Sequence, residues 1–286
     1  MPMIEAVRRR PGMWFGEVRQ PGGLLNFFFE LISELITFHG ASAVQVGIAA
    51  ENVLRIEHNG RPFVAADFPP NMSPGRWADK IAVCRFFHAR VHDGVASFRD
   101  GQPADAIALP DGAGLWCQPD PGIFTSPVPL DIFLATGRAQ PFAVCHPGTS
   151  ITLRQAGRER VLHYPHGPID RLLELGRDDM LHAPLRWRAQ TQDGSCDLAI
   201  AICDHDHDVL ETYVNGRKCE GGTHEAQLRL LLERGLKRPI AVSAVVVFEL
   251  DRPRFAGPRR DLLSDERAGQ ILAKAVEPRL IELARL

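Results

Sequence analysis

The sequence predicts an α+β fold, and two observations support this prediction. Hairpin signals, in which two alternating apolar segments flank a tight turn, recur at Asp93-Gly94, at Gly157 and at Asp193-Gly194. Longer segments with apolar residues at helical spacing lie between these hairpins and after the last of them. With 286 residues, 45% of them hydrophobic, the chain can bury one large core or two ordinary ones.

The chain is expected to open with a short basic helix. Arg8, Arg9 and Arg10 run directly into Pro11-Gly12, where the helix should stop because proline cannot continue its hydrogen bonding. The three large side chains that follow are expected to anchor the core: Met13, Trp14 and Phe15.

Helices and strands alternate along the rest of the chain. A helix is expected over residues 22–40, because its apolar residues share one stripe and glycines bound both ends. Strands at 43–50 and 53–64 follow, and then a proline-rich loop at 65–79. The later elements are expected to be hairpins at 81–103, 149–165 and 184–204, helices at 130–140, 168–178, 223–236 and 264–286, and a strand at 241–255.

Charge and composition exclude several classes of protein. The formal net charge is −2, from 33 Lys+Arg and 35 Asp+Glu, so only a local basic patch could attract nucleic acid. The sequence shows neither a signal segment nor an apolar run of about 18 residues, and no membrane partner is expected. The six cysteines form no CxxC pair, which favours reduced core thiols in a cytoplasmic protein over a zinc site.

Five segments carry a resemblance to a known family. They are "EAVRRRPGMWFG" (5–16), "DGAGLWCQPDPGIF" (111–124), "PGTSITLRQAGRERVLHYPHG" (147–167), "ETYVNGRKCEGGTHEAQ" (211–227) and "VVFELDRPRFAGPRR" (246–260). In this order and spacing they resemble the ATPase half of gyrase B, a subunit of DNA gyrase, and its relatives, which belong to the GHKL class of ATPases.

The resemblance implies two domains. Residues 1–176 would form a GHKL, or Bergerat-type, two-layer α/β sandwich with helices on one face of a mixed sheet. Residues 177–286 would form a transducer-like domain of the ribosomal-protein-S5-domain-2-like α+β type. Because the chain starts four residues before the opening motif, a dimer is expected to lack the family's N-terminal arm clasp. Because it stops at Leu286, no cleavage domain is expected.

The family's catalytic positions are partly retained. Glu30 stands where the family's general base activates water, although a solvent-facing helix glutamate would look the same. Glu34, one helical turn further on, replaces the asparagine that holds Mg²⁺; a carboxylate can bind the metal, but it adds negative charge beside a triphosphate. Arg260 replaces the lysine that reaches the γ-phosphate, and it either contacts phosphate or is a solvated loop residue.

The positions that would recognise adenine also depart from the family. His58 replaces the aspartate that accepts a hydrogen bond from the adenine amino group, and neutral histidine can accept one such bond. Gly60 and Arg61 are retained, but Pro62 replaces the second glycine of the motif and restricts the loop. Ala113 stands where a threonine hydroxyl would support the base.

The family's Gly-rich lid over the phosphates is missing. Between Arg61 and Asp93 the one glycine is Gly75, and the segment is shorter than the family's. Successive backbone N–H groups of such a lid would form the phosphate cradle. ATP and Mg²⁺ are therefore implied by the resemblance, but their binding to this chain is expected to be impaired.

Two polar segments allow more than one interpretation. Cys203, His205 and His207 could bind a transition metal, but a polar hairpin tip is favoured. A local basic set could contact DNA from the inner wall of the transducer, or could only solvate a loop; it comprises Arg252, Arg254, Arg259 and Arg260.

The sequence therefore predicts a degenerate, stand-alone gyrase-B-like module related to DNA topological change. It is expected to be impaired in ATP hydrolysis and to act by binding a topoisomerase subunit, another protein or DNA, for example as a decoy that protects gyrase from a drug or toxin. Two alternatives stay open at this point. One is a slow ATPase that uses Glu30, Glu34 and Arg260, and the other is a structural homodimer.

Overall fold

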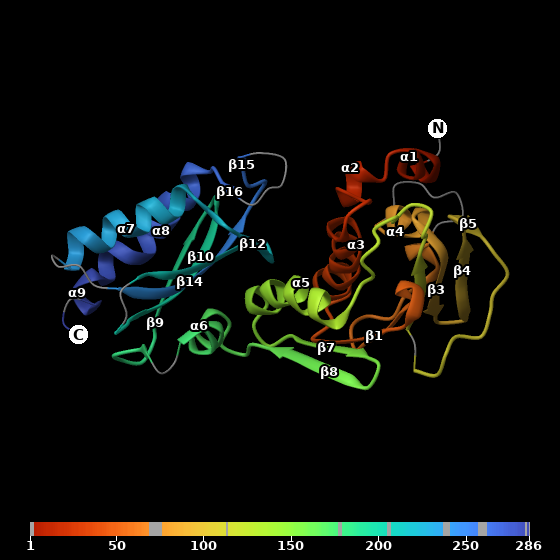
Figure 1. Cartoon of the computed structure of the whole chain (residues 1–286), viewed down its shortest axis with the longest axis horizontal. Coiled ribbons are helices and arrows are strands. Elements are labelled where there is room, and N and C mark those ends of the chain that lie inside the picture. The colour runs from red at the N-terminus through yellow and green to blue at the C-terminus, as the bar shows by residue number, and fades with distance from the viewer. Residues whose placement is uncertain are drawn as a thin grey trace. The chain divides into compact units, whose positions relative to one another are not determined.

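The structure is a computed structural model that describes residues 3–68, 76–112, 114–176, 179–204, 207–236, 241–256, 262–283 and 285. It divides into two compact units (Figure 1), the first comprising residues 1–140 and 149–163 and the second 141–148 and 164–286. Helix α6 (Pro168–Gly176) packs on strands of the second unit. The domain boundary expected after residue 176 therefore falls inside the second unit.

The first unit is built on a mixed sheet of eight strands among the described residues. Their order is β5-β4-β3-β6-β2-β1-β7-β8, with β1 parallel to β7 and every other neighbour antiparallel. The strands are β1 (Ala43–Ile48), β2 (Leu54–His58), β3 (Cys84–Val91), β4 (Gly94–Arg99), β5 (Gln102–Pro103), β6 (Leu115–Pro119), β7 (Ser150–Gln155) and β8 (Arg158–His163).

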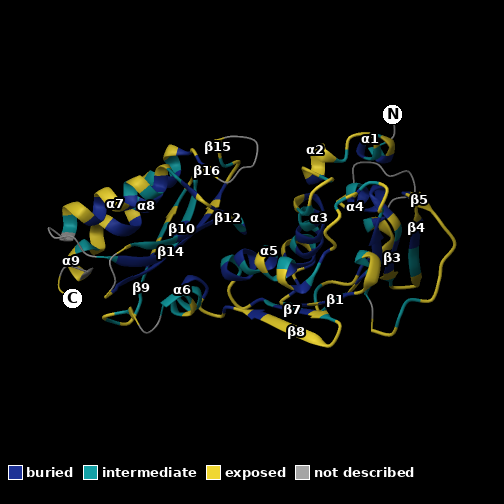
Figure 2. Ribbon diagram, viewed as in Figure 1, coloured by how far each residue is buried: buried dark blue, intermediate teal, exposed yellow. Residues whose placement is uncertain are grey.

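Helices cover one face of this sheet. They are α1 (Met3–Arg9), α2 (Gly12–Phe15), α3 (Pro21–Ser33), a π-helical turn η1 (Glu34–Phe38), α4 (Ala78–Ala82) and the first part of α5 (Ile132–Cys145). Apolar residues of α3 and of alternate strand positions are buried together, whereas the other strand positions carry exposed charged side chains, as along β8 (Figure 2). On the second sheet face, the side chains of β1, β2, β7 and β8 are exposed or half-buried, whereas His88 of β3 and Gln118 of β6 are buried.

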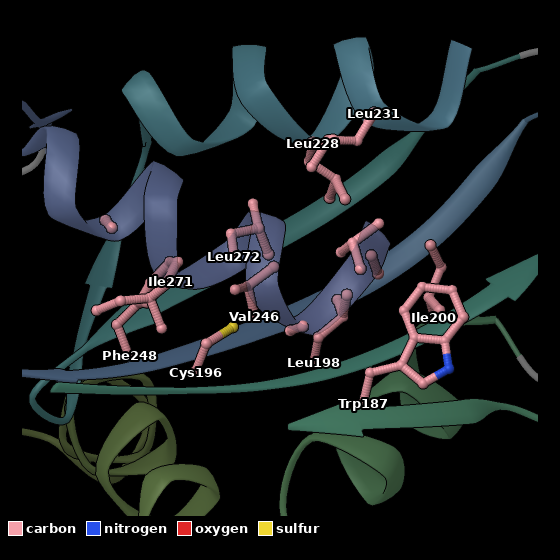
Figure 3. Close-up of a cluster of buried hydrophobic side chains, with 14 of the residues drawn as sticks. Trp187, Cys196, Leu198, Ile200, Leu228, Leu231, Val246, Phe248, Ile271 and Leu272 are labelled. Atoms are coloured by element: carbon pink, nitrogen blue, oxygen red, sulfur yellow. The ribbon is translucent and has the colours of Figure 1, made fainter. Parts of the chain in front are cut away.

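The second unit has a five-stranded sheet of order β12-β11-β14-β10-β9, in which β11 and β14 are parallel. Its strands are β9 (Leu185–Thr191), β10 (Gly194–Ile202), β11 (Val209–Val214), β12 (Arg217–Cys219) and β14 (Val242–Leu250). Helices α7 (Thr223–Leu236) and α8 (Glu266–Val276) pack together over a core that includes Trp187, Leu198 and Phe248 (Figure 3). Short strands β13 (Gly221–Gly222), β15 (Phe255–Ala256) and β16 (Leu262–Leu263) form a small additional sheet.

The α+β prediction is confirmed, and the expected hairpins turn where the sequence placed them. The expectation that Met13 and Trp14 anchor the core is wrong. Phe15 is fully buried against Phe27, but Met13 is 73% exposed and Trp14 37% exposed. Helix α2 is one turn long, so only one of three consecutive side chains can point inward.

Several element boundaries differ from the prediction. The strand expected over 53–64 ends at His58, and the strand expected over 241–255 ends at Leu250. The helix expected over 22–40 changes to a π-helical turn after Ser33, where the Thr37 hydroxyl donates to the Ser33 carbonyl at 2.6 Å. The loop expected over 65–79 includes the start of α4. Helix α5 continues through Pro141 beyond the expected end at 140. The closing helix is interrupted at η5 (Glu277–Arg279), which contains Pro278, before α9 (Leu280–Leu283).

All six cysteines are free, and five of them are buried, which agrees with their expected role as core thiols. Among the described residues, no helix has the length and apolar character needed to cross a bilayer.

Candidate functional site

The residues predicted to bind the nucleotide meet where strand β2 ends beside the C-terminal end of η1. The Arg61 backbone N–H donates to the His39 carbonyl at 2.6 Å, and His39 Nδ1 donates to the Arg61 carbonyl at 2.9 Å. A Cβ atom at Gly60 would lie 2.5 Å from the His39 carbonyl oxygen, so only glycine allows this close approach. The two segments are thus joined directly to each other.

His58, at the predicted adenine-reading position, is packed against aromatic side chains. Its ring centroid lies 5.2 Å from that of Phe63 and 5.7 Å from that of His39. Phe63 in turn lies 4.7 Å from His39 and 5.4 Å from Trp77, and Phe63 and Trp77 are each only 1% exposed. We call His39, His58, Phe63, Phe68 and Trp77 the ring cluster.

The ring cluster is polar but buried. His58 Nδ1, His39 Nε2 and Trp77 Nε1 are shielded from solvent and have no hydrogen-bond partner among the described residues. Burial lowers the pKa of His58 from 6.5 to about 4, and the neighbouring His39 acts in the same direction. Burial also lowers the pKa of His39, although the hydrogen bond to the Arg61 carbonyl acts to raise it. Both rings are therefore neutral at pH 7.

Glu34, at the predicted Mg²⁺ position, is held by cations of the chain itself. Its carboxylate oxygens lie 3.6 Å from Lys80 Nζ and 3.7 Å from Arg76 Nη1. The Lys80 side chain is 4% exposed, and its ammonium group also donates to the Arg76 carbonyl at 3.0 Å and to Asp79 at 3.2 Å. Four charges therefore neutralise one another here: those of Glu34, Asp79, Arg76 and Lys80.

Arg61 and Arg76 are also engaged within the chain. Arg61 donates to both carboxylate oxygens of Asp67, at 3.1 and 3.2 Å. The guanidinium groups of Arg61 and Arg76 lie 5.3 and 4.0 Å from the centre of the Phe38 ring, within cation–π range. Arg61 thus binds Asp67 through its hydrogen bonds and Phe38 through a cation–π contact.

The residues present do not fit ATP with Mg²⁺. Rings of the protein pack against His58, the residue that would recognise the base. An ammonium group lies beside Glu34, the carboxylate that would hold the metal. Within the part of the chain that is described, no cluster of three or more His, Cys, Asp or Glu side chains is suited to a metal ion.

The structure brings some of the predicted site residues together. Glu34, His58, Gly60 and Arg61 converge on the ring cluster, and Glu30 lies half-buried on α3 one turn before Glu34. Arg252 and Arg254 are exposed after β14, and Arg252 adopts a positive φ of 46°. Ala113, His205, Arg259 and Arg260 lie outside the described residues.

Sequence reasoning missed Phe63, Trp77 and Lys80, the residues that contact His39, His58 and Glu34. The sequence pattern puts Phe63 in a strand end and Trp77 in a loop, and it does not single out Lys80. One signal in the sequence could have indicated this packing. Aromatic residues are concentrated on both sides of the proline-rich segment, where the family would have the glycines of its lid.

Comparisons with known proteins agree with this fold. No family model matches the chain. The chain is 21% identical over 99% of its length to the chloroplastic/mitochondrial gyrase B of Oryza sativa subsp. japonica. It is 26% identical over 81% of its length to the DNA gyrase B protein of Streptococcus pneumoniae. The chain spans 49% and 43% of these two relatives, so it corresponds to about half of each.

Solved structures give the same result. The 43K ATPase domain of Thermus thermophilus gyrase B, determined with an aminocoumarin, superposes with a TM-score of 0.80 at 19% identity, covering 99% of this chain and 90% of that one. Gyrase B of Myxococcus xanthus superposes with a TM-score of 0.78 at 20% identity, covering 98% of this chain and 95% of that one. The chain therefore has the fold of these gyrase B ATPase regions. Its similarity to gyrase B in both sequence and fold confirms the resemblance carried by its motifs.

The neutral histidines predict sensitivity to acid. Because the folded-state pKa of His58 lies below its unfolded value of 6.5, the unfolded chain binds the proton more readily. Stability should be fully present above pH 6.5 and fall by about 2 kcal/mol as the pH decreases through about 4, after allowance for partial exposure. Urea denaturation of the full chain at several pH values measures this loss of stability.

A His58→Leu variant should lose most of this acid dependence, whereas His92→Gln should keep it because the His92 side chain is 89% exposed. Equal acid dependence in the wild type and in His58→Leu would contradict the prediction.

Proposed function

We propose that this chain is a gyrase-B-like module, related to DNA topological change, that is impaired in ATP hydrolysis and acts by binding. The observation that carries the proposal is the set of contacts that His58 and Glu34 make within the chain itself. The ring cluster packs around His58, and Lys80 lies beside Glu34 at the predicted metal position. The missing Gly-rich lid supports it further.

The partner we propose is a topoisomerase subunit or DNA. The curated relatives are named as gyrase subunits, and this chain corresponds to about half of each. The proposal of such a partner rests on this similarity in sequence and fold, which is an analogy at the level of the fold. Arg252 and Arg254 are exposed, which is compatible with DNA contact.

ATP binding and turnover test this proposal directly. Isothermal titration with a non-hydrolysable ATP analogue and Mg²⁺ should give no heat of binding. Phosphate release should be more than about 100-fold below that of a lid-bearing gyrase B ATPase region assayed in parallel, because the phosphates would lack their aligned donors.

A Glu30→Gln variant is the control for the alternative of a slow ATPase. Phosphate release that is measurable in the wild type and disappears in Glu30→Gln would show that Glu30 acts as a base, and the proposal would then be wrong. Release that is equal in both proteins would be attributed to a contaminating ATPase.

A further inference from the structure

One row of side chains crosses the second face of the eight-stranded sheet, and it is exposed or half-buried from β8 to Trp116 of β6 and buried at His88 of β3. Strand pairing places Gly47 of β1 opposite Arg55 of β2 on one side and opposite Arg154 of β7 on the other. The row continues in both directions through registered pairs, and its members are Glu159, Arg154, Gly47, Arg55, Trp116 and His88. Residues in register on neighbouring strands share a face, so these side chains rise on the same side of the sheet.

A groove follows from the missing side chain of Gly47. The cavity there has a volume of about 510 Å³, and its lining includes Gly47, Arg55, Trp116, Arg154 and Arg158. An adjoining cavity of about 170 Å³ shares Gly47, Arg55 and Arg154. A Cβ atom at Gly47 would meet Arg55 at 3.8 Å, an ordinary van der Waals contact, so the groove has room for a larger side chain at this position. We call this feature the Gly47 groove.

The ion pairs along the Gly47 groove are exposed and weak. Arg55 lies 2.9 Å from Glu57, with side chains 44% and 38% exposed. Arg154 lies 2.6 Å from Glu159, with side chains 55% and 49% exposed. Exposed pairs of this kind contribute little, so an anionic ligand can compete with the carboxylates for both guanidinium groups. Arg158 also lines the groove, with its guanidinium group 5.6 Å from the centre of the Phe133 ring, so three arginines and two glutamates surround the groove.

Aromatic rings continue the same face. The Trp116 ring lies 4.8 Å from Phe86 and 5.7 Å from His88, and Trp116 and Phe86 are both half-buried. A partly exposed tryptophan beside arginines offers a stacking surface next to anion-binding groups. This combination matches the alternation of planar bases and phosphates in a nucleic-acid strand.

We propose that the Gly47 groove binds single-stranded DNA, with a base stacked on Trp116 and phosphates at Arg55 and Arg154. In a duplex the base faces are covered by their neighbours, so Trp116 can stack only on a base that is free of the helix. The proposal rests on the DNA partner of the proposed function, but it does not depend on whether ATP is bound.

Anisotropy of a labelled oligothymidylate of about 15 nucleotides tests the proposal. The full chain should bind it at low salt, with affinity that falls as salt rises. Gly47→Val fills the groove without changing charge, suits a strand and should weaken binding at least tenfold. Arg55→Gln/Arg154→Gln should reduce the magnitude of the log–log salt slope by about 1.4, for two single-strand phosphate contacts. Trp116→Leu should weaken binding about tenfold.

Two further variants sharpen the result. Glu57→Gln/Glu159→Gln should tighten binding, because it removes the carboxylates that compete for the arginines. Arg9→Gln/Arg19→Gln removes the same charge as the groove double variant from exposed positions outside the groove, and it should bind within about twofold of the wild type. Circular dichroism confirms that each variant is folded.

Several outcomes would overturn the proposal. These are absence of binding at low salt, unchanged binding by Gly47→Val, or displacement by polyglutamate as effective as by unlabelled oligonucleotide. Loss of binding in Arg252→Gln/Arg254→Gln with Gly47→Val unaffected would assign DNA to the loop after β14 instead. None of these results depends on ATP titration or phosphate release, so a failure here is distinct from a failure of the impaired ATPase.

Discussion

A Lys80→Met variant is expected to lower the free energy of unfolding by about 3 kcal/mol. The Lys80 side chain is 4% exposed, and its ammonium group lies close to two carboxylates, those of Glu34 and Asp79. Methionine keeps the length of the side chain but leaves both carboxylates without their buried cation. Arg76 lies 3.7 Å from Glu34 and partly compensates its charge. The loss of stability should therefore lie at the lower end of the range for a broken buried ion pair. Urea denaturation followed by tryptophan fluorescence measures it.

Lys274→Met is the matched control, because Lys274 is exposed on α8 and the same substitution there should change stability by less than about 0.5 kcal/mol. Glu34→Gln/Lys80→Met should recover part of the lost stability, since removing both charges leaves fewer uncompensated ones. A double variant as unstable as the sum of the single ones would mean that Glu34 and Lys80 do not interact.

The coupling of Glu34 to Lys80 bears on function as well as on stability. A metal site needs a carboxylate that is available to a cation from solution, whereas Glu34 has a cation built into the fold. The two arginines nearest to the site are likewise held by Asp67, Glu34 and Phe38. The internal ion pairs and the ring cluster therefore both support the proposal that ATP hydrolysis is impaired in this chain.

The sequence predicted the fold better than the site. Hairpins at Asp93-Gly94 and Asp193-Gly194 could be located because turn chemistry and strand alternation are local signals. The helix after residue 21 was equally clear, but its π-helical end at Glu34 was not, because the change of hydrogen-bonding pattern has no local sequence signature. Local patterns thus gave the elements and left their ends uncertain by a few residues.

The ring cluster depends on contacts between distant segments. Phe63 and Trp77 are 14 positions apart, and both meet His39, which lies more than 20 positions before Phe63. Substitution of the adenine-reading aspartate by His58 indicated a departure from the family, but only the packing identifies what lies beside the histidine. The Gly47 groove likewise requires the pairing of β1 with β7, which are about 100 residues apart and parallel.

In the second unit, Glu211→Ala is expected to cost about 3–5 kcal/mol. The Glu211 carboxylate accepts hydrogen bonds from Arg171 at 2.8 and 3.0 Å, from Lys218 at 2.8 Å and from the Tyr213 hydroxyl. These contacts tie α6 to β11 and β12. Alanine would leave the 1%-exposed Tyr213 with a hydroxyl that has lost its acceptor, and would leave Arg171 with Glu174 alone. Glu211→Gln should cost less, because it retains one acceptor oxygen.

The pH dependence of this loss identifies its cause. Burial alone would raise the pKa of Glu211, but the hydrogen bonds from Arg171, Lys218 and Tyr213 together outweigh it and lower the pKa from 4.5 to about 2. At about 1.4 kcal/mol per pKa unit, this difference contributes about 3 kcal/mol of stability above pH 4.5, which is lost as the pH falls through about 2. The stability gap between the wild type and Glu211→Ala should therefore narrow between pH 4.5 and pH 2 in urea titrations. A gap that stayed constant over this range would mean that packing of the side chain, and not its ionised hydrogen bonds, holds α6 in place.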